Sequence, residues 1–103
     1  MIHIEHLTSV VRIYAPGHSY AAGDEPKAVA TLSRTDVGEV EIRAAMGRLG
    51  RADMRDIAQA LAANGVRMLV VKRRAGHSVP LGRLRKTHGP FSYYEISTAE
   101  ACA

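Results

Sequence analysis

The sequence predicts an α+β domain in which one principal amphipathic helix packs on a mostly antiparallel sheet of about five strands, in the order β-β-β-α-β-β. Three observations support this class. Residues 27–34 and 39–46 alternate between apolar and polar side chains, as strands with one buried face do. Residues 53–64 carry apolar residues at helical spacing. Residues 68–71 are apolar on both faces, which is typical of a central strand covered on both sides.

Strands are expected before the helix at Val10–Tyr14, Lys27–Arg34 and Glu39–Met46. Residues 15–26 contain four of the chain's glycine and proline breakers and an acidic pair, so we expect a loop there. Residues 35–38 read Thr-Asp-Val-Gly and predict a hairpin turn. In the third strand, alternation places Val40, Ile42, Ala44 and Met46 on one face and Glu39, Glu41 and Arg43 on the other.

The helix is expected to begin at Asp53, a good N-cap residue, with Asp56 three residues later in an arrangement that resembles a capping box. Asn64 and Gly65 end it, because glycine readily takes the left-handed conformation found after helices. One buried stripe is formed by Met54, Ile57, Ala58, Leu61 and Ala62.

After the helix, we expect strands at Val66–Arg73 and Phe91–Ile96, joined by a turn region and by a basic, irregular segment, Arg83–Pro90. The strand–helix–strand unit of residues 39–73 should form a parallel or split crossover. The 103 residues fit a single domain, which we place at residues 1–97, followed by a flexible tail at 98–103.

Charge is distributed unevenly along the chain, whose net charge is +4. Residues 1–42 hold three basic and six acidic side chains, whereas residues 43–88 hold eleven basic and two acidic ones. Two interpretations stay open: an anionic partner, such as phosphate groups or nucleic acid, or a solvated face that keeps the protein in solution.

The single cysteine, Cys102, excludes an intrachain disulfide, so we expect a reduced, cytoplasmic environment. No run of residues approaches the ~20 apolar residues of a membrane span. The five histidines and the cysteine lack the spacing of a zinc site, so no metal is expected.

The turn Gly47–Ala52 is the first candidate site. Glycines at 47 and 50 permit close backbone approach, and the helix that follows offers N–H donors to an anion. From this turn the chain resembles the GNAT-type N-acetyltransferases, in which two strands lead into a turn of pattern Arg/Gln-x-x-Gly-x-Gly/Ala, then a helix and a further strand. Gly50 and Ala52 match the last two motif positions, whereas the first position is Gly47 here.

The resemblance implies that the pyrophosphate of acetyl-coenzyme A is bound by Gly47, Arg48, Gly50, Arg51 and Ala52. It also implies that the strands before and after the helix splay apart to make a slot for this cofactor. The resemblance covers residues 27–73 and lacks the first helices, which form much of the substrate side in full family members. In its shortness and arginine content the chain also resembles GNAT-like proteins of phages and prophages, which implies such an origin.

Catalytic residues stay unassigned. Glu39 or Glu41, on the strand before the turn, would be positioned as a base, and Tyr93 or Tyr94 as an acid. No family motif fixes any of them, and paired carboxylates on a strand usually belong to a solvated face. A complete enzyme is therefore not expected; if the chain is one, it is an N-acetyltransferase.

Two alternatives to a coenzyme-binding domain follow from other features. A set of basic residues brackets an expected hairpin after residues 66–73, with Tyr93 and Tyr94 nearby in sequence. It predicts a nucleic-acid-binding module and consists of Lys72, Arg73, Arg74, Arg83, Arg85 and Lys86. A small open sheet has an exposed edge, which predicts a structural protein that forms homo-oligomers by pairing strands.

Overall fold

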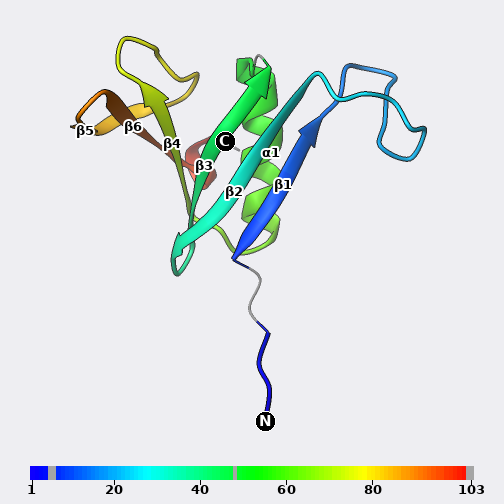
Figure 1. Ribbon diagram of the computed structural model, residues 1–103, viewed down its shortest axis with the longest axis horizontal. Coiled ribbons are helices and arrows are strands. Elements are labelled where there is room, and N and C mark those ends of the chain that lie inside the picture. Colours follow the sequence, from blue (N-terminus) through cyan, green and yellow to red (C-terminus); the bar gives the residue numbers. More distant parts are fainter. Residues whose placement is uncertain (5–6, 48, 102–103) are drawn as a thin grey trace.

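The computed structural model describes residues 1–4, 7–47 and 49–101. They form one six-stranded sheet, in the order β1-β2-β3-β4-β6-β5, with helix α1 packed on one face (Figure 1). The elements are β1 Thr8–Ile13, β2 Ala28–Asp36, β3 Glu39–Gly47, α1 Arg51–Ala63, β4 Met68–Arg74, β5 Arg83–His88, β6 Phe91–Ser97 and α2 Thr98–Ala101.

The α+β class and the principal helix are confirmed, and the sheet has six strands rather than about five. The sheet is mixed: four neighbouring pairs are antiparallel, in agreement with a mostly antiparallel sheet, and β3 and β4 run parallel, as expected for the crossover at residues 39–73. The missed strand is β5, which was expected to be irregular. All six of its side chains are exposed, so it lacks the apolar alternation that reveals a strand. Its backbone pairing with β6 holds it at the sheet edge.

The hydrophobic core lies between the sheet and α1. Ile42, Met54 and Leu69 are the largest fully buried side chains, and they come from β3, α1 and β4. The stripe predicted for the helix is buried at Met54, Ile57 and Ala58. In β4, Leu69, Val70 and Val71 are all buried, which confirms a central strand covered on both faces.

A β-bulge interrupts β3 just before its end. Thr31 of β2 pairs with Arg43 and Val29 pairs with Met46, so three steps along β3 oppose two along β2. An extra residue reverses the alternation of side chains beyond it and bends the strand. The prediction that Met46 shares the buried face of Ile42 is therefore wrong: Met46 is 73% exposed.

The bulge lies where β3 leaves its other neighbour. The parallel pairing of β3 with β4 joins Glu39–Ile42 to Met68–Val71 and ends there. Beyond this point β3 continues beside β2 as far as Gly47, whereas β4 continues beside β6 as far as Arg74. The two strands diverge in Figure 1, and α1 begins at the open end between them.

The helix begins earlier than predicted. Gly50 occupies the N-cap position, and Asp53 is the third helical residue, whose carboxylate accepts a hydrogen bond from the Gly50 N–H at 2.9 Å. Asp53 is thus not the N-cap but the residue that reaches back to it. At the other end, Gly65 has φ +81°, in agreement with its predicted role after the helix.

Part of the predicted tail is ordered. Thr98–Ala101 form the short helix α2, in which Thr98 is buried and its hydroxyl donates to the carbonyl oxygen of Val66 at 2.8 Å. Residues 102 and 103 lie outside the described residues. Within the described part of the chain, no helix has the length and apolar character needed to cross a membrane.

The two glycines of the predicted cofactor turn have different conformational requirements. Gly47 has φ +88°, and a Cβ added to it would lie 2.9 Å from the Ala28 Cα and closer still to the Lys27 carbonyl oxygen. Gly50 has an extended backbone, and a Cβ there would meet only the Asp53 carboxylate at 3.7 Å. The sequence did not distinguish these two roles.

We expect Gly47→Ala to lower the free energy of unfolding by at least about 2 kcal/mol, because the new methyl group meets backbone atoms and the left-handed conformation is unfavourable. Gly50→Ala should stay within about 1 kcal/mol of the parent, since it loses only some N-cap preference and gains rigidity. Urea denaturation of both variants measures the difference. Equal losses would contradict the role of β2 in excluding a side chain at position 47.

Candidate functional site

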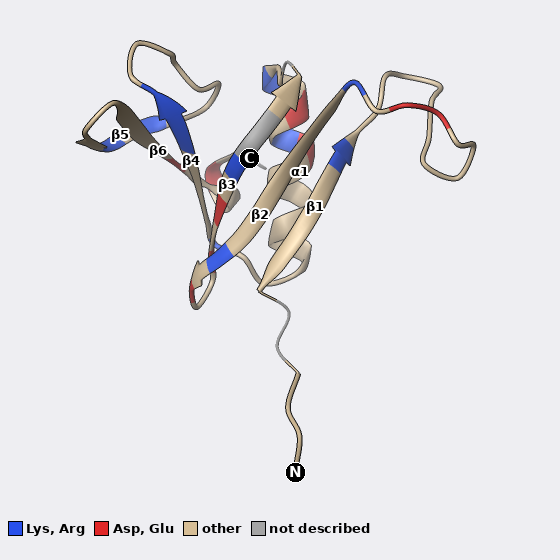
Figure 2. Ribbon diagram, viewed as in Figure 1, with Lys and Arg blue, Asp and Glu red and all other residues tan. Residues whose placement is uncertain are grey.

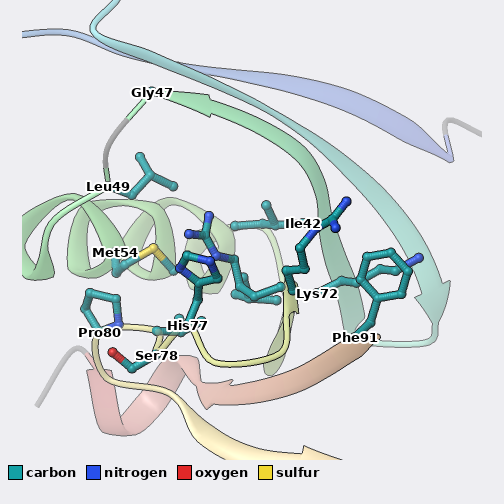
Figure 3. Close-up of a pocket in the computed structure, with 13 residues that line it drawn as sticks. Ile42, Gly47, Leu49, Met54, Lys72, His77, Ser78, Pro80 and Phe91 are labelled. Carbon is teal, nitrogen blue, oxygen red and sulfur yellow. The ribbon is translucent and has the colours of Figure 1, made fainter. Parts of the chain in front are cut away.

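A cavity of about 650 Å³ fills the space between the diverging strands β3 and β4; we call it the wedge (Figure 3). Its lining comes from β3, the turn into α1, α1 itself, β4, the loop after β4 and the start of β6. The residues are Ile42, Gly47, Leu49, Met54, Val71, Lys72, Arg73, Arg74, His77, Ser78, Val79, Pro80 and Phe91.

The wedge is closed where the strands meet and open toward their carboxyl ends. Ile42 and Val71, the last pair that joins β3 to β4, are both buried and form the closed end. Leu49 and Met54 enter from the turn and the helix, and His77 and Ser78 from the loop that follows β4 (Figure 3). An apolar interior with a few polar groups at its mouth is typical of a small-molecule site.

The wedge reaches both faces of the sheet. Side chains alternate along β4, so Arg73 lies on the helix side with Val71, whereas Lys72 and Arg74 lie on the opposite side. Lys72 contacts the ring of Phe91, with 4.2 Å between its Nζ and the ring centroid. Residues of both faces line one cavity because the strands between them have parted.

The parted strands leave backbone groups without a strand partner on the wedge side. No pairing joins β3 to β4 beyond Ile42 and Val71 among the described residues. The peptide groups of residues 43–47 and 72–74 that face the wedge therefore have no partner strand there in the described part of the chain. Such an edge binds extended chains with amide groups, as an exposed strand binds a peptide.

The start of α1 supplies a second type of group. The N–H groups of Arg51, Ala52 and Asp53 precede the first intrahelical bond, in which the Met54 N–H donates to the Gly50 carbonyl. Gly50, Arg51 and Ala52 are all exposed. The helix dipole and these donors favour an anion at this position.

Asp53 places a fixed negative charge beside this helix start. Its carboxylate accepts the Gly50 N–H and forms an ion pair with Lys27 at 3.0 Å between Oδ1 and Nζ. The Gly50 hydrogen bond first, and then Lys27, lower the pKa of Asp53 below its usual value, while burial opposes this effect. The pair also ties β2, which follows Lys27, to the helix.

The predicted cofactor residues divide into two groups. Gly47 lines the wedge, and Gly50, Arg51 and Ala52 lie beside it at the helix start without lining it. Arg48 lies outside the described residues.

The predicted nucleic-acid residues also divide. Lys72, Arg73 and Arg74 line the wedge, whereas Arg83, Arg85 and Lys86 lie on β5 at the edge of the sheet.

The residues considered as base and acid do not line the wedge. Glu39 accepts hydrogen bonds from the Thr35 hydroxyl at 2.8 Å and from Arg85 at 3.0 Å. Glu41 is buried and forms an ion pair with Arg43. Both carboxylates thus have arginine partners.

The two tyrosines lie on opposite faces of β6. Tyr94 packs against the core, and Tyr93 lies under Lys86 on the far face of the sheet from α1. Neither tyrosine lines the wedge, and neither do Glu39 and Glu41.

Sequence reasoning missed the part of the wedge that follows β4. His77, Ser78 and Pro80 belong to a segment that reads only as a turn, and nothing in their residue types marks a site. Leu49 and Met54 were also missed, because they read as ordinary apolar residues of a helix start. In the described part of the chain, no three His, Cys, Asp or Glu side chains gather closely enough to hold a metal ion.

We expect Asp53→Asn to lower the free energy of unfolding by about 1–2 kcal/mol at pH 7, because a charge-assisted hydrogen bond and an ion pair are lost. The folded-state pKa of Asp53 lies below the ordinary aspartate value of 3.8, so this stabilisation is present above about pH 4 and is lost as the pH falls through the folded pKa. Urea denaturation from pH 7 to pH 2 should therefore show the two proteins converging in acid. Asp56→Asn, exposed on the same helix, is the control; a constant gap at all pH values would contradict the assignment.

Comparisons with known proteins identify the fold. No protein-family model and no curated protein matches the chain. Among solved structures, the crystal structure of the PaiA N-acetyltransferase from Thermoplasma acidophilum in complex with coenzyme A is similar, with a TM-score of 0.62 and 10% sequence identity. The match covers 88% of this chain and 61% of the other. At this identity the likeness concerns the fold, which is the GNAT-like fold expected from the turn at residues 47–52.

Proposed function

We propose that this protein binds coenzyme A or acetyl-coenzyme A in the wedge between β3 and β4. The observation that carries the proposal is the parting of these strands directly beside the free N–H groups of α1. Closed pairing of β3 with β4 would leave no room for the pantetheine arm. The similarity of the fold to that of a coenzyme A complex supports the choice of ligand.

The chemistry of the wedge suits the parts of this ligand. The pantetheine arm is an extended chain with amide groups, and residues 43–47 and 72–74 present unpaired peptide groups to it. The pyrophosphate would be held at the helix start by the N–H groups of Arg51 and Ala52. A volume of about 650 Å³ lies within the ~300–1,000 Å³ of small-molecule sites.

Basic side chains stand where the phosphates would enter. Arg73 and Arg74 lie at the carboxyl end of β4, at the open end of the wedge, and Arg51 lies on the first turn of α1. The nucleotide part of coenzyme A carries several negative charges, so this charge distribution favours it over a neutral ligand.

The proposal concerns binding. When bound, acetyl-coenzyme A supplies an activated thioester. Glu39 and Glu41 are each engaged by an arginine and lie outside the wedge lining, so no base is assigned to them. If the chain does transfer the acetyl group, the similar structure suggests an amine as the acceptor.

Calorimetry with acetyl-coenzyme A, coenzyme A and adenosine 3′,5′-bisphosphate tests the proposal. We expect both coenzyme forms to bind and the bisphosphate, which lacks the pantetheine arm, to bind at least tenfold more weakly. No heat at millimolar coenzyme concentrations would overturn the proposal.

A wedge-filling variant locates the site. Ser78 lines the wedge and is exposed, so Ser78→Trp should occupy the cavity without removing core contacts, and we expect at least a tenfold loss of affinity. Ala22→Trp, in the exposed loop after β1, is the matched control. The chain has no other tryptophan, so fluorescence reports whether the new ring is buried. Equal affinities of both variants would place the ligand elsewhere.

The free edge of β1 favours a second candidate function, self-assembly into a homo-oligomer. Among the described residues β1 pairs with β2 alone, so its outer edge has peptide groups without a strand partner there, and Val10 on this strand is 51% exposed. Arg12 is the one charged residue of this strand, so the edge carries little charge to oppose pairing with another copy.

Light scattering at high protein concentration should detect dimers or larger species, and Val10→Lys should shift the population to monomer, because a charge on an edge strand opposes pairing. Val37→Lys, at an exposed apolar position in the β2–β3 turn, is the control. A strictly monomeric parent protein would contradict this candidate.

A further inference from the structure

The sheet face opposite α1 carries basic and aromatic side chains in a regular arrangement over β4, β6 and β5. Cross-strand partners form two rows, one of Lys72, Tyr93 and Lys86, and one of Arg74, Phe91 and His88. We call these six residues the basic–aromatic face. Figure 2 shows basic residues on β4 and on β5, the two strands that flank β6.

The two aromatic rings stand on the same face of the central strand of this group. Phe91 and Tyr93 are two residues apart on β6, so both point away from α1, whereas Tyr94 points toward the core. Each ring has an ammonium group over it: Lys72 Nζ lies 4.2 Å from the Phe91 centroid, and Lys86 Nζ lies 4.9 Å from that of Tyr93. The residues Phe91 and Tyr93 are half-buried, so part of each is accessible to solvent.

We propose that the basic–aromatic face binds single-stranded nucleic acid, with bases stacked on Phe91 and Tyr93 and phosphates beside Lys72, Arg74 and Lys86. Rings on a sheet surface stack unpaired bases, and neighbouring cations neutralise the backbone. The two rings are about 6.6 Å apart along the strand, twice the ~3.4 Å between stacked bases. Only a strand whose bases can unstack matches this spacing, which favours a single strand over a duplex.

The ammonium groups do not block this use of the rings. A cation–π contact at an exposed site is weaker than a base–aromatic stack. A lysine side chain is also flexible, so its ammonium group can exchange the contact with the ring for an ionic contact with a phosphate. The cations are therefore already at the positions where a bound strand needs them.

Ion pairs within the protein determine which basic residues of this region are counted in the basic–aromatic face. Arg85 is held by Glu39 at 3.0 Å and by Glu95 at 3.7 Å, so it is engaged within the protein. Arg73, on the other side of β4, belongs to the wedge. Of the basic residues that the sequence grouped together, Lys72, Arg74 and Lys86 thus lie on the face with Phe91, which the sequence did not single out.

An acidic peptide is the competing partner, because it also seeks cations. It has no bases to stack, so its binding would depend on lysine and arginine and not on the rings. The two aromatic residues and their spacing therefore favour nucleic acid over an acidic peptide. A variant that removes one ring distinguishes the two partners.

The test is fluorescence anisotropy with labelled twelve-nucleotide oligouridylate, oligothymidylate and a duplex of equal length. We expect both single strands to bind more tightly than the duplex, with affinity that falls steeply as salt rises. Tyr93→Leu should weaken single-strand binding about tenfold. Lys86→Gln should reduce the slope of log K against log salt by about 0.7.

Controls separate this face from general charge and from the wedge. Arg55→Gln on α1 removes the same charge as Lys86→Gln from an exposed position away from the face and should leave the salt slope nearly unchanged. Tyr93 and Lys86 do not line the wedge, so their variants should bind coenzyme A normally. Thermal unfolding of each variant shows whether it has folded.

A direct reporter is available because Phe91 is the only phenylalanine of the chain. Fluorophenylalanine labelling gives a single fluorine signal, which should shift when oligouridylate is added. Three results would each overturn the proposal: an unchanged fluorine signal, full binding by folded Tyr93→Leu, or binding of the duplex as tight as that of the single strands. Equal competition by polyglutamate, together with unchanged binding by Tyr93→Leu, would identify an acidic protein surface as the partner instead.

Discussion

The architecture depends on one extra residue in β3. Between Arg43 and Met46 this strand advances three residues while β2 advances two, and the bend begins directly after Ile42, the last residue paired with β4. A strand that bends away from one neighbour must follow the other. As a result β3 stays with β2, β4 stays with β6, and the space between them becomes the wedge. The helix that joins these two strands then begins at the open end, with its N–H groups beside the cavity.

The sequence predicts the parts of this fold that depend on local periodicity. The stripe of Met54, Ile57 and Ala58 and the apolar run at residues 69–71 identify the helix and the central strand correctly. The bulge has no such signature, because residues 43–46 continue an alternation that reads equally well without it. β5 was missed for a related reason: an exposed edge strand has no buried face to produce a pattern. The N-cap was misplaced because Asp53 is a common capping residue, whereas Gly50 caps through its backbone.

The candidate site was predicted in part. The turn was located from its glycines and the helix that follows, yet most of the wedge lining comes from segments distant in sequence, including the loop at His77 and Ser78. Only the topology, with β4 between β3 and β6, brings them together. The likeness to an N-acetyltransferase concerns the fold, and a phage or prophage origin stays a prediction.

The charged residues of the sheet fall into two groups, the carboxylates that are held in ion pairs and the basic residues at the end of β4. Glu39, Glu41 and Glu95 are engaged by Arg43 and Arg85, so most carboxylates of this region are neutralised where the strands are still joined. Lys72, Arg73 and Arg74 stand further along β4, past the point of divergence. The two proposed ligands meet at Lys72, Arg74 and Phe91, which belong to both the wedge and the basic–aromatic face.

At Gly47, the end of β3 that forms one wall of the wedge packs against the backbone of residues 27 and 28 on the side away from the cavity. The missing side chain of Gly47 allows the end of β3 to lie on Lys27 and Ala28 of the neighbouring strand, while the Lys27 ammonium group holds the start of α1 through Asp53. Two residues that do not line the wedge thus set both the direction of β3 and the position of the helix. In an evolving chain of this fold, the shape of the wedge can therefore change through substitutions at Lys27 or Ala28, behind the wall that faces it.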